Sequence, residues 1–112
     1  MEQRIISFSI DEIAVDTDDV VNSINDACTK RHLHYWVRGV CQVEQRVYFI
    51  LLPITEGRDS EIYRLEALPE EEIGHEDFVS DLNERYQGGF DTVGSFKVYD
   101  TIMVVFAKSA SA

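Results

Sequence analysis

The stretch GVCQVEQRVYFILLP, from Gly39 to Pro53, decides the fold, and the stretch GSFKVYDTIMVVFAK, from Gly94 to Lys108, repeats its pattern. Each stretch predicts a half-apolar strand, a two-residue turn (Glu44-Gln45 or Tyr99-Asp100), and a return strand that is apolar almost throughout. A strand with one solvated face would carry a polar residue at every second position, and neither return strand does. We therefore expect both return strands to be buried on both faces, in the middle of a sheet.

Periodicity and capping residues predict the remaining elements. Alternation indicates a strand from Arg4 to Ile10, after which the run DEIAVDTDD turns the chain. Asp16 is a typical N-cap residue, so a helix should run from about Thr17 to Lys30, with Val15 packing against Val20 at its start. The other expected elements are strands at about 35–43, 46–52 and 61–68, a helix at about 75–87 and a closing hairpin at about 92–107.

Two halves of the chain, about 4–53 and 61–108, show the same order of strand, helix, strand and strand. Residues 58 positions apart match in the two helices, as Val20 matches Phe78, and residues 55 apart match in the two hairpins. We therefore predict an internal duplication. The expected fold is α+β: two βαββ units that form a mainly antiparallel sheet of about six strands, with both helices on one face, of the ferredoxin-like sandwich type.

At 112 residues the chain fits a single domain, 1–112, with a core that needs neither a metal nor disulfides. The two return strands need cover on the second face of the sheet. Three kinds of cover are open: a second copy of the chain, closure of the sheet into a barrel, or a bound apolar ligand. A homodimer is the expected solution, because most soluble oligomers are twofold homodimers.

The formal net charge of −11, from 21 acidic and 10 basic residues, limits the partners. A phosphate backbone or an anionic membrane surface would repel this chain, so we expect neither nucleic acid nor a membrane as a direct partner. No stretch approaches the ~20 apolar residues of a spanning helix, and the start MEQRIISFSIDE lacks the pattern of a secretory signal, so a cytoplasmic location is expected. Cys28 and Cys41 are interpreted as small apolar residues, not as a disulfide.

Few residues have the types and spacing that metal binding or catalysis requires. His32, His34 and Cys41 resemble a set of metal ligands, but a closed zinc site takes four, so we expect no metal and no cofactor. The chain has no P-loop, no GxGxxG and no GxSxG motif, and no Cys-His pair in the context of a nucleophile. We therefore predict no catalytic residue.

Two functions are compatible with these features. The first is a non-enzymatic acidic interaction protein that binds a basic protein. A more specific possibility within this class is an inhibitor that mimics DNA. The alternative is a small-molecule-binding domain, or a small enzyme, with a pocket against the sheet, because Trp and Arg are common binding anchors. The acidic face of the first function would consist of Asp18, Asp26, Glu76, Asp81 and Glu84. The pocket of the alternative would be lined by Trp36, Arg38, Tyr63 and His34.

Overall fold

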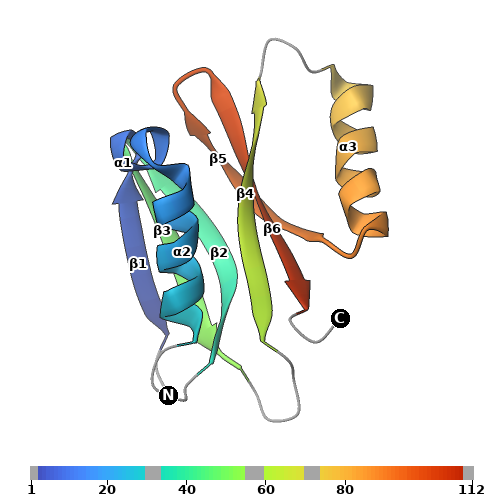
Figure 1. Cartoon of the computed structure of the whole chain (residues 1–112). Helices are drawn as coiled ribbons and strands as arrows, with labels where there is room; N and C mark the ends of the chain where they lie inside the picture. The colour runs from blue at the N-terminus through green and yellow to red at the C-terminus, as the bar shows by residue number, and fades with distance from the viewer. Residues whose placement is uncertain (1–2, 30–33, 55–59, 70–73, 110–112) are drawn as a thin grey trace.

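The structure of the protein is a computed structural model, and it describes residues 3–29, 34–54, 60–69 and 74–109. Nine elements follow one another along these residues (Figure 1). They are β1 (Arg4–Ser9), α1 (Ile10–Val15), α2 (Thr17–Cys28), β2 (Tyr35–Val43), β3 (Arg46–Pro53), β4 (Glu61–Pro69), α3 (His75–Gln87), β5 (Asp91–Val98) and β6 (Thr101–Ser109). No helix in this described part of the chain is long and apolar enough to cross a membrane.

The six strands form two antiparallel sheets of three strands each. Sheet A has the order β1-β3-β2, and sheet B has the order β4-β6-β5. Both expected hairpins are confirmed, since β2 pairs with β3 and β5 pairs with β6. Glu44 and Tyr99, in the two turns, have positive φ angles of 54° and 55°, the left-handed conformation that tight hairpin turns use.

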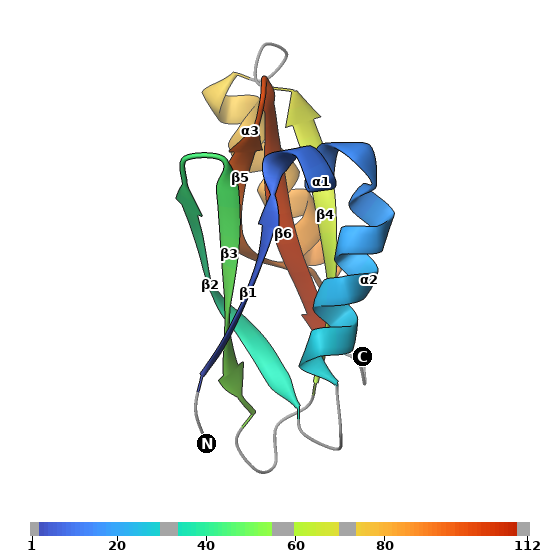
Figure 2. The same ribbon diagram turned by 90° about the vertical axis from the view of Figure 1, so that its left-hand side faces the viewer.

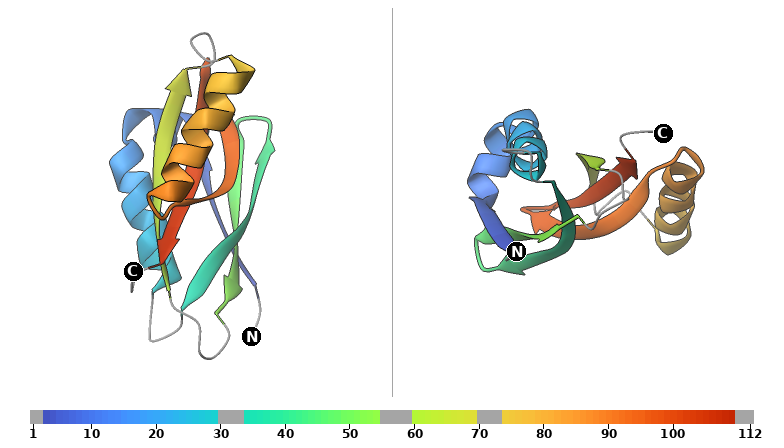
Figure 3. Two further views of the ribbon diagram at one scale, coloured as in Figure 1. Left: turned by 90° about the vertical axis from the view of Figure 1, so that its right-hand side faces the viewer. Right: turned by 90° about the horizontal axis from the view of Figure 1, so that it is seen from below.

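The expected single sheet with both helices on one face is wrong. The two sheets face each other, α2 covers one side of the core between them, beside β4, and α3 lies on the outer face of sheet B (Figure 3). A single sheet would leave one face of both return strands to an outside partner. Packing one half of the chain onto the other buries one face of each sheet within the chain itself, at no cost in association entropy.

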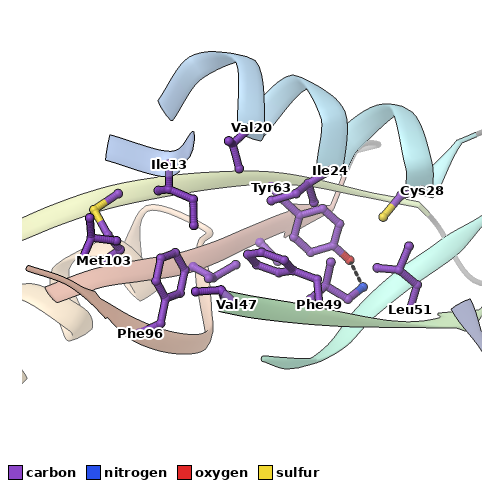
Figure 4. Close-up of a cluster of buried hydrophobic side chains, with 14 of the residues drawn as sticks. Ile13, Val20, Ile24, Cys28, Val47, Phe49, Leu51, Tyr63, Phe96 and Met103 are labelled. Carbon is purple, nitrogen blue, oxygen red and sulfur yellow. Dashed lines mark hydrogen bonds between the residues drawn. The ribbon is translucent and has the colours of Figure 1, made fainter. Parts of the chain in front are cut away.

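Most of the core lies between the two sheets (Figure 4). Phe49 of β3 is fully buried, and its ring meets Phe8 and Phe96 edge to face, at centroid distances of 5.9 and 6.0 Å. The helices contribute Ile13, Val20, Ile24 and Cys28 to the same cluster. A second cluster, between α3 and the outer face of sheet B, contains Leu68, Phe78, Leu82, Phe90, Ile102, Val104 and Phe106.

The two return strands differ in what covers them. In β6 the run from Met103 to Ala107 is buried on both faces, as predicted, because one face meets the core and the other meets α3. In β3, Val47, Phe49 and Leu51 are buried, but Leu52 on the opposite face is 39% exposed. The prediction of cover on both faces is therefore wrong for β3: no described helix lies over its outer face (Figure 2).

A short helix, α1, replaces part of the expected turn. Ser9 caps it, because the Glu12 N–H donates to Ser9 Oγ at 3.1 Å and the Ser9 N–H donates to Glu12 Oε1 at 3.4 Å. The predicted N-cap of α2 is confirmed, since the Asp19 N–H donates to Asp16 Oδ1 at 3.0 Å. Val15 is 86% exposed, however, so its expected packing at the start of α2 does not occur.

The two halves correspond in more than the order of their elements. Both sheets place the return strand in the middle, and the register shifts at matching places, between Val37 and Gly39 in β2 and between Thr92 and Gly94 in β5. The two left-handed turn residues lie 55 positions apart, as the two bulge glycines do. An internal duplication predicts these correspondences and remains our interpretation of them.

Candidate functional site

The outer face of sheet A carries an apolar surface with no described helix over it (Figures 2 and 3). The strand registers place its side chains opposite the buried Val47, Phe49 and Leu51, because paired residues share a face of the sheet. We call these side-chain positions the open face. They are Ile5, Ser7, Ser9, Trp36, Gly39, Cys41, Val43, Arg46, Tyr48, Ile50 and Leu52.

The open face combines exposed apolar side chains with an absence of negative charge. Ile5 is 54% exposed, Val43 is 58% exposed and Leu52 is 39% exposed. None of the positions of the open face carries a carboxylate, although 21 of the 112 residues of the chain are acidic. Its charged residue is Arg46, whose Nε donates to Ser7 Oγ at 2.9 Å. Exposed apolar surface on a sheet is typical of a contact with another protein.

Trp36 and Arg38, two of the predicted binding residues, lie together at one end of sheet A. The guanidinium carbon of Arg38 lies 4.2 Å from the centroid of the Trp36 ring, which is cation–π geometry. Arg38 Nη1 also lies 3.4 Å from Glu61 Oε1, at the start of β4. The pair therefore joins the open face to the first residue of sheet B, and the stacking keeps the guanidinium at the surface.

Tyr63 lies in the core, 2% exposed, and does not line a pocket beside Trp36 as expected. Its hydroxyl accepts from the Val37 N–H at 2.8 Å (Figure 4). The same hydroxyl donates to Glu61 Oε1 at 2.9 Å. Burial raises the pKa of the Tyr63 phenol well above its usual range; the Val37 N–H opposes this shift, and Glu61 adds to it. The hydroxyl therefore holds β4 to β2 across the core, and it is not available to a ligand at the surface.

The residues that resemble metal ligands do not come together in the part of the chain that the structure describes. His34 is exposed, Cys41 is exposed on the open face, and His32 lies outside the described residues. Among residues 3–29, 34–54, 60–69 and 74–109, no group of three or more His, Cys, Asp or Glu side chains could hold a metal ion. Neither His34 nor Cys41 therefore belongs to a described cation site.

Cys28 is the buried cysteine, 1% exposed on the core side of α2. Burial, and then the charge of Glu61, raise the pKa of its thiol to about 11. In the unfolded chain the same thiol ionises from about pH 8.5. Above that pH the unfolded state loses a proton that the folded state keeps, so the folded state loses stability as the pH rises.

We expect the free energy of unfolding to fall by up to about 1.4 kcal/mol per pH unit from about pH 8.5 to 11, because Cys28 stays protonated only in the folded state. Tyr63 should add to the loss from about pH 10, since burial also raises the pKa of its phenol. Urea unfolding over this pH range measures the slope. Cys28→Ala should flatten it below about pH 10, whereas Cys41→Ala, at the exposed cysteine, should not. An unchanged slope in Cys28→Ala would contradict this account.

The carboxylates expected to form one acidic face lie instead on two helices, at opposite sides of the molecule (Figure 1). Asp18 and Asp26 are exposed on α2, and we call them the α2 surface. Glu76 and Glu84 are exposed on α3, and we call them the α3 surface. Asp81 is half-buried, 4.0 Å from Arg85 Nη1. It is therefore tied to its own helix, and the single predicted face becomes two acidic surfaces.

An ion-pair cluster that sequence reasoning missed holds α3 to sheet B. Glu66 Oε2 lies 3.1 Å from Arg64 Nη2 and 3.2 Å from Arg85 Nε. Burial would raise the pKa of Glu66, but the hydrogen bond from Arg85 and the charge of Arg64 hold this pKa below its ordinary value. Glu66 and Arg85 lie 19 residues apart, so no local pattern predicts their ion pair. It forms because α3 packs on sheet B.

Two carboxamides, also missed in the sequence, occupy the two outer edges of sheet B. The Asn25 side chain donates to the Tyr63 carbonyl at 3.0 Å and accepts from the Tyr63 N–H at 2.9 Å. The Gln42 side chain makes the same pair of bonds with the backbone of Lys97, at 2.7 and 3.0 Å. A carboxamide presents one donor and one acceptor, as a neighbouring strand would. Each contact therefore occupies one N–H and one carbonyl at the edge of β4 or β5 that another strand could otherwise use.

Comparisons with known proteins find no match for the chain, whether among family models, curated protein sequences or solved structures.

Proposed function

We propose that the protein is an interaction module without catalytic chemistry, which binds a basic protein through the carboxylates of its helices and a second copy of itself through the open face. The main support for this proposal is the uneven distribution of carboxylates over the surface. The open face has no carboxylate, whereas the α2 and α3 surfaces hold exposed carboxylates. Apolar burial contributes affinity, and charge steers the encounter with an oppositely charged partner.

The position of two carboxylates supports a role beyond stability. Asp26 lies in the last turn of α2, and Glu84 lies at the matching position of α3, 58 residues on. A negative charge near the C-terminal end of a helix opposes the helix dipole, at a cost of about 0.3–1 kcal/mol. No ion pair within the described residues involves either carboxylate. The helix dipole therefore does not favour acidic residues at these two positions.

The experiment that tests this proposal compares three double variants with the same net charge, −11 + 2 = −9. Asp18→Asn/Asp26→Asn neutralises the α2 surface, and Glu76→Gln/Glu84→Gln neutralises the α3 surface. The matched control, Glu44→Gln/Asp91→Asn, neutralises two exposed carboxylates that are not part of a helix. Basic proteins captured from cells by the unaltered chain are purified, and their association rates with each variant are measured over a range of salt concentrations.

We expect one helix variant to associate at least about tenfold more slowly than the control at low salt, and to lose most of the salt dependence. The reason is that steering depends on where the charge lies and is screened beyond about 8 Å at physiological ionic strength. Equal rates and equal salt slopes in the three variants would mean that the carboxylates act only through the net charge, and the proposed binding surfaces would be wrong.

A further inference from the structure

The two halves of the chain do not pack through equivalent faces of their sheets. In sheet A, Val47, Phe49 and Leu51 share the core with α2, so this is the face that the helix of the same half covers. In sheet B, the face under α3 carries Ile102, Val104 and Phe106. The other face of sheet B, which has no helix of its own half, packs into the core with α2 (Figure 4). The helix side of the first half therefore meets the helix-free side of the second.

This arrangement leaves one sheet face without its counterpart. Met103, Val105 and Ala107, on the helix-free side of sheet B, are at most 5% exposed. The residues 55 positions earlier are Tyr48, Ile50 and Leu52, which belong to the open face of sheet A. The open face is therefore the equivalent of a surface that the other half buries against a helix.

The same arrangement leaves one helix without its counterpart. In α2, Asn25 bonds to the backbone of β4, and Cys28 is 1% exposed. The residues 58 positions later in α3 are Asn83, which is exposed, and Tyr86, which is 68% exposed. A shallow hollow runs along this side of α3, lined by Glu76, Val79, Ser80, Asn83, Glu84 and Gln87. Val79 is the apolar residue of this mainly polar hollow and is 43% exposed, so Val79 and Tyr86 are apolar side chains of α3 that no described part of the chain covers.

The charges of the two uncovered surfaces are complementary. Glu76 and Glu84 lie along the hollow of α3, whereas the open face carries Arg46 and no carboxylate. Arg38, stacked on Trp36 at the end of the open face, has a side chain that is 39% exposed. A twofold contact of the open face with itself would bring together two surfaces that each carry Arg46 and no carboxylate, whereas Arg38 already has the Glu61 carboxylate beside it. A contact with α3 pairs opposite charges instead.

We propose that copies of this chain associate head to tail, with the exposed side of α3 from one copy on the open face of sheet A in the next. This inference rests on the proposed self-association and specifies the surface of the second copy. In this contact, α3 of one copy lies beside β1 of the next copy, as α2 lies beside β4 within one chain. Asn83 then lies at the edge of that β1, as Asn25 lies at the edge of β4. Such a contact is heterologous, so it does not close in a dimer, and the assembly grows with concentration.

The test uses three variants of the full chain that each add one carboxylate at an exposed apolar position. Leu52→Asp alters the open face, Tyr86→Asp alters α3, and Val15→Asp is the matched control, 86% exposed and outside both surfaces. Circular dichroism and urea unfolding first establish that each variant is folded. Sedimentation equilibrium then gives the mass of each protein, and of mixtures, across the micromolar range.

We expect the unaltered chain and Val15→Asp to grow beyond the dimer as concentration rises. Leu52→Asp and Tyr86→Asp should each stay monomeric alone, because each lacks one of the two surfaces. An equimolar mixture of the two should form a species of twice the chain mass and nothing larger, since α3 of Leu52→Asp and the open face of Tyr86→Asp are both intact.

Two other outcomes would overturn the inference, and they separate it from the proposed function. If Tyr86→Asp dimerises alone and the mixture contains no heterodimer, the copies meet through their open faces by twofold symmetry, and only the head-to-tail arrangement is wrong. If the unaltered chain is monomeric throughout, self-association is wrong altogether, while the carboxylate variants still test the basic partner independently.

Discussion

Replacing Phe49 by alanine should lower the free energy of unfolding by about 3–5 kcal/mol, a large part of the stability of a small domain. Phe49 is fully buried in the middle strand of sheet A, and its ring makes edge contacts with Phe8 and Phe96. The loss has two parts: the free energy gained by burying the ring is lost, and the cavity left between the two sheets adds a further cost. Because strands and helices surround the site, the core cannot collapse to fill this cavity.

Urea unfolding at neutral pH and low protein concentration measures this loss. The control is Val43→Ala, on the neighbouring strand but 58% exposed, which should cost less than about 1 kcal/mol. If Phe49→Ala cost no more than this control, the packing of the two sheets against each other at Phe49 would be wrong.

Asn25→Leu should cost about 2–4 kcal/mol, although leucine has a similar size and a higher helix propensity. The change removes both bonds between the carboxamide and the backbone of Tyr63, and leaves an N–H and a carbonyl at the edge of β4 without these partners. A partly buried backbone group that loses its hydrogen bond costs about 1–3 kcal/mol. The uncovered edge should also make the protein more prone to aggregate.

Hydrogen exchange provides a second measurement, because the Tyr63 N–H should exchange much faster in Asn25→Leu than in the unaltered chain. Asn83→Leu is the matched control: it makes the same change at the equivalent, exposed position of α3 and should change stability by less than about 0.5 kcal/mol. A similar loss in both variants would show that helix or solvation effects, and not the bonds to β4, account for the result.

Neighbouring residues in the sequence determine where the helices, strands and turns of this protein form, and which of their positions are apolar. The turns at Glu44 and Tyr99, the N-cap at Asp16 and the helix from His75 to Gln87 each depend on a few neighbouring residues, and all were predicted. The net charge is likewise a property of composition. The short helix α1 escaped prediction because its capping box is divided between two predicted elements: Ser9 lies in the predicted strand, and Glu12 lies in the run predicted to turn the chain.

Only the tertiary structure decided how the two halves pack and which surfaces remain uncovered. The run of apolar residues in β3 predicts two buried faces, but periodicity cannot say which face another part of the same chain will cover. Tyr63 and Asn25 acquired their roles in the same way, because their partners lie 26 and 38 residues away along the chain. The open face exists because the first half packs its helix side against the second half, and this choice depends on long-range contacts that no local pattern records.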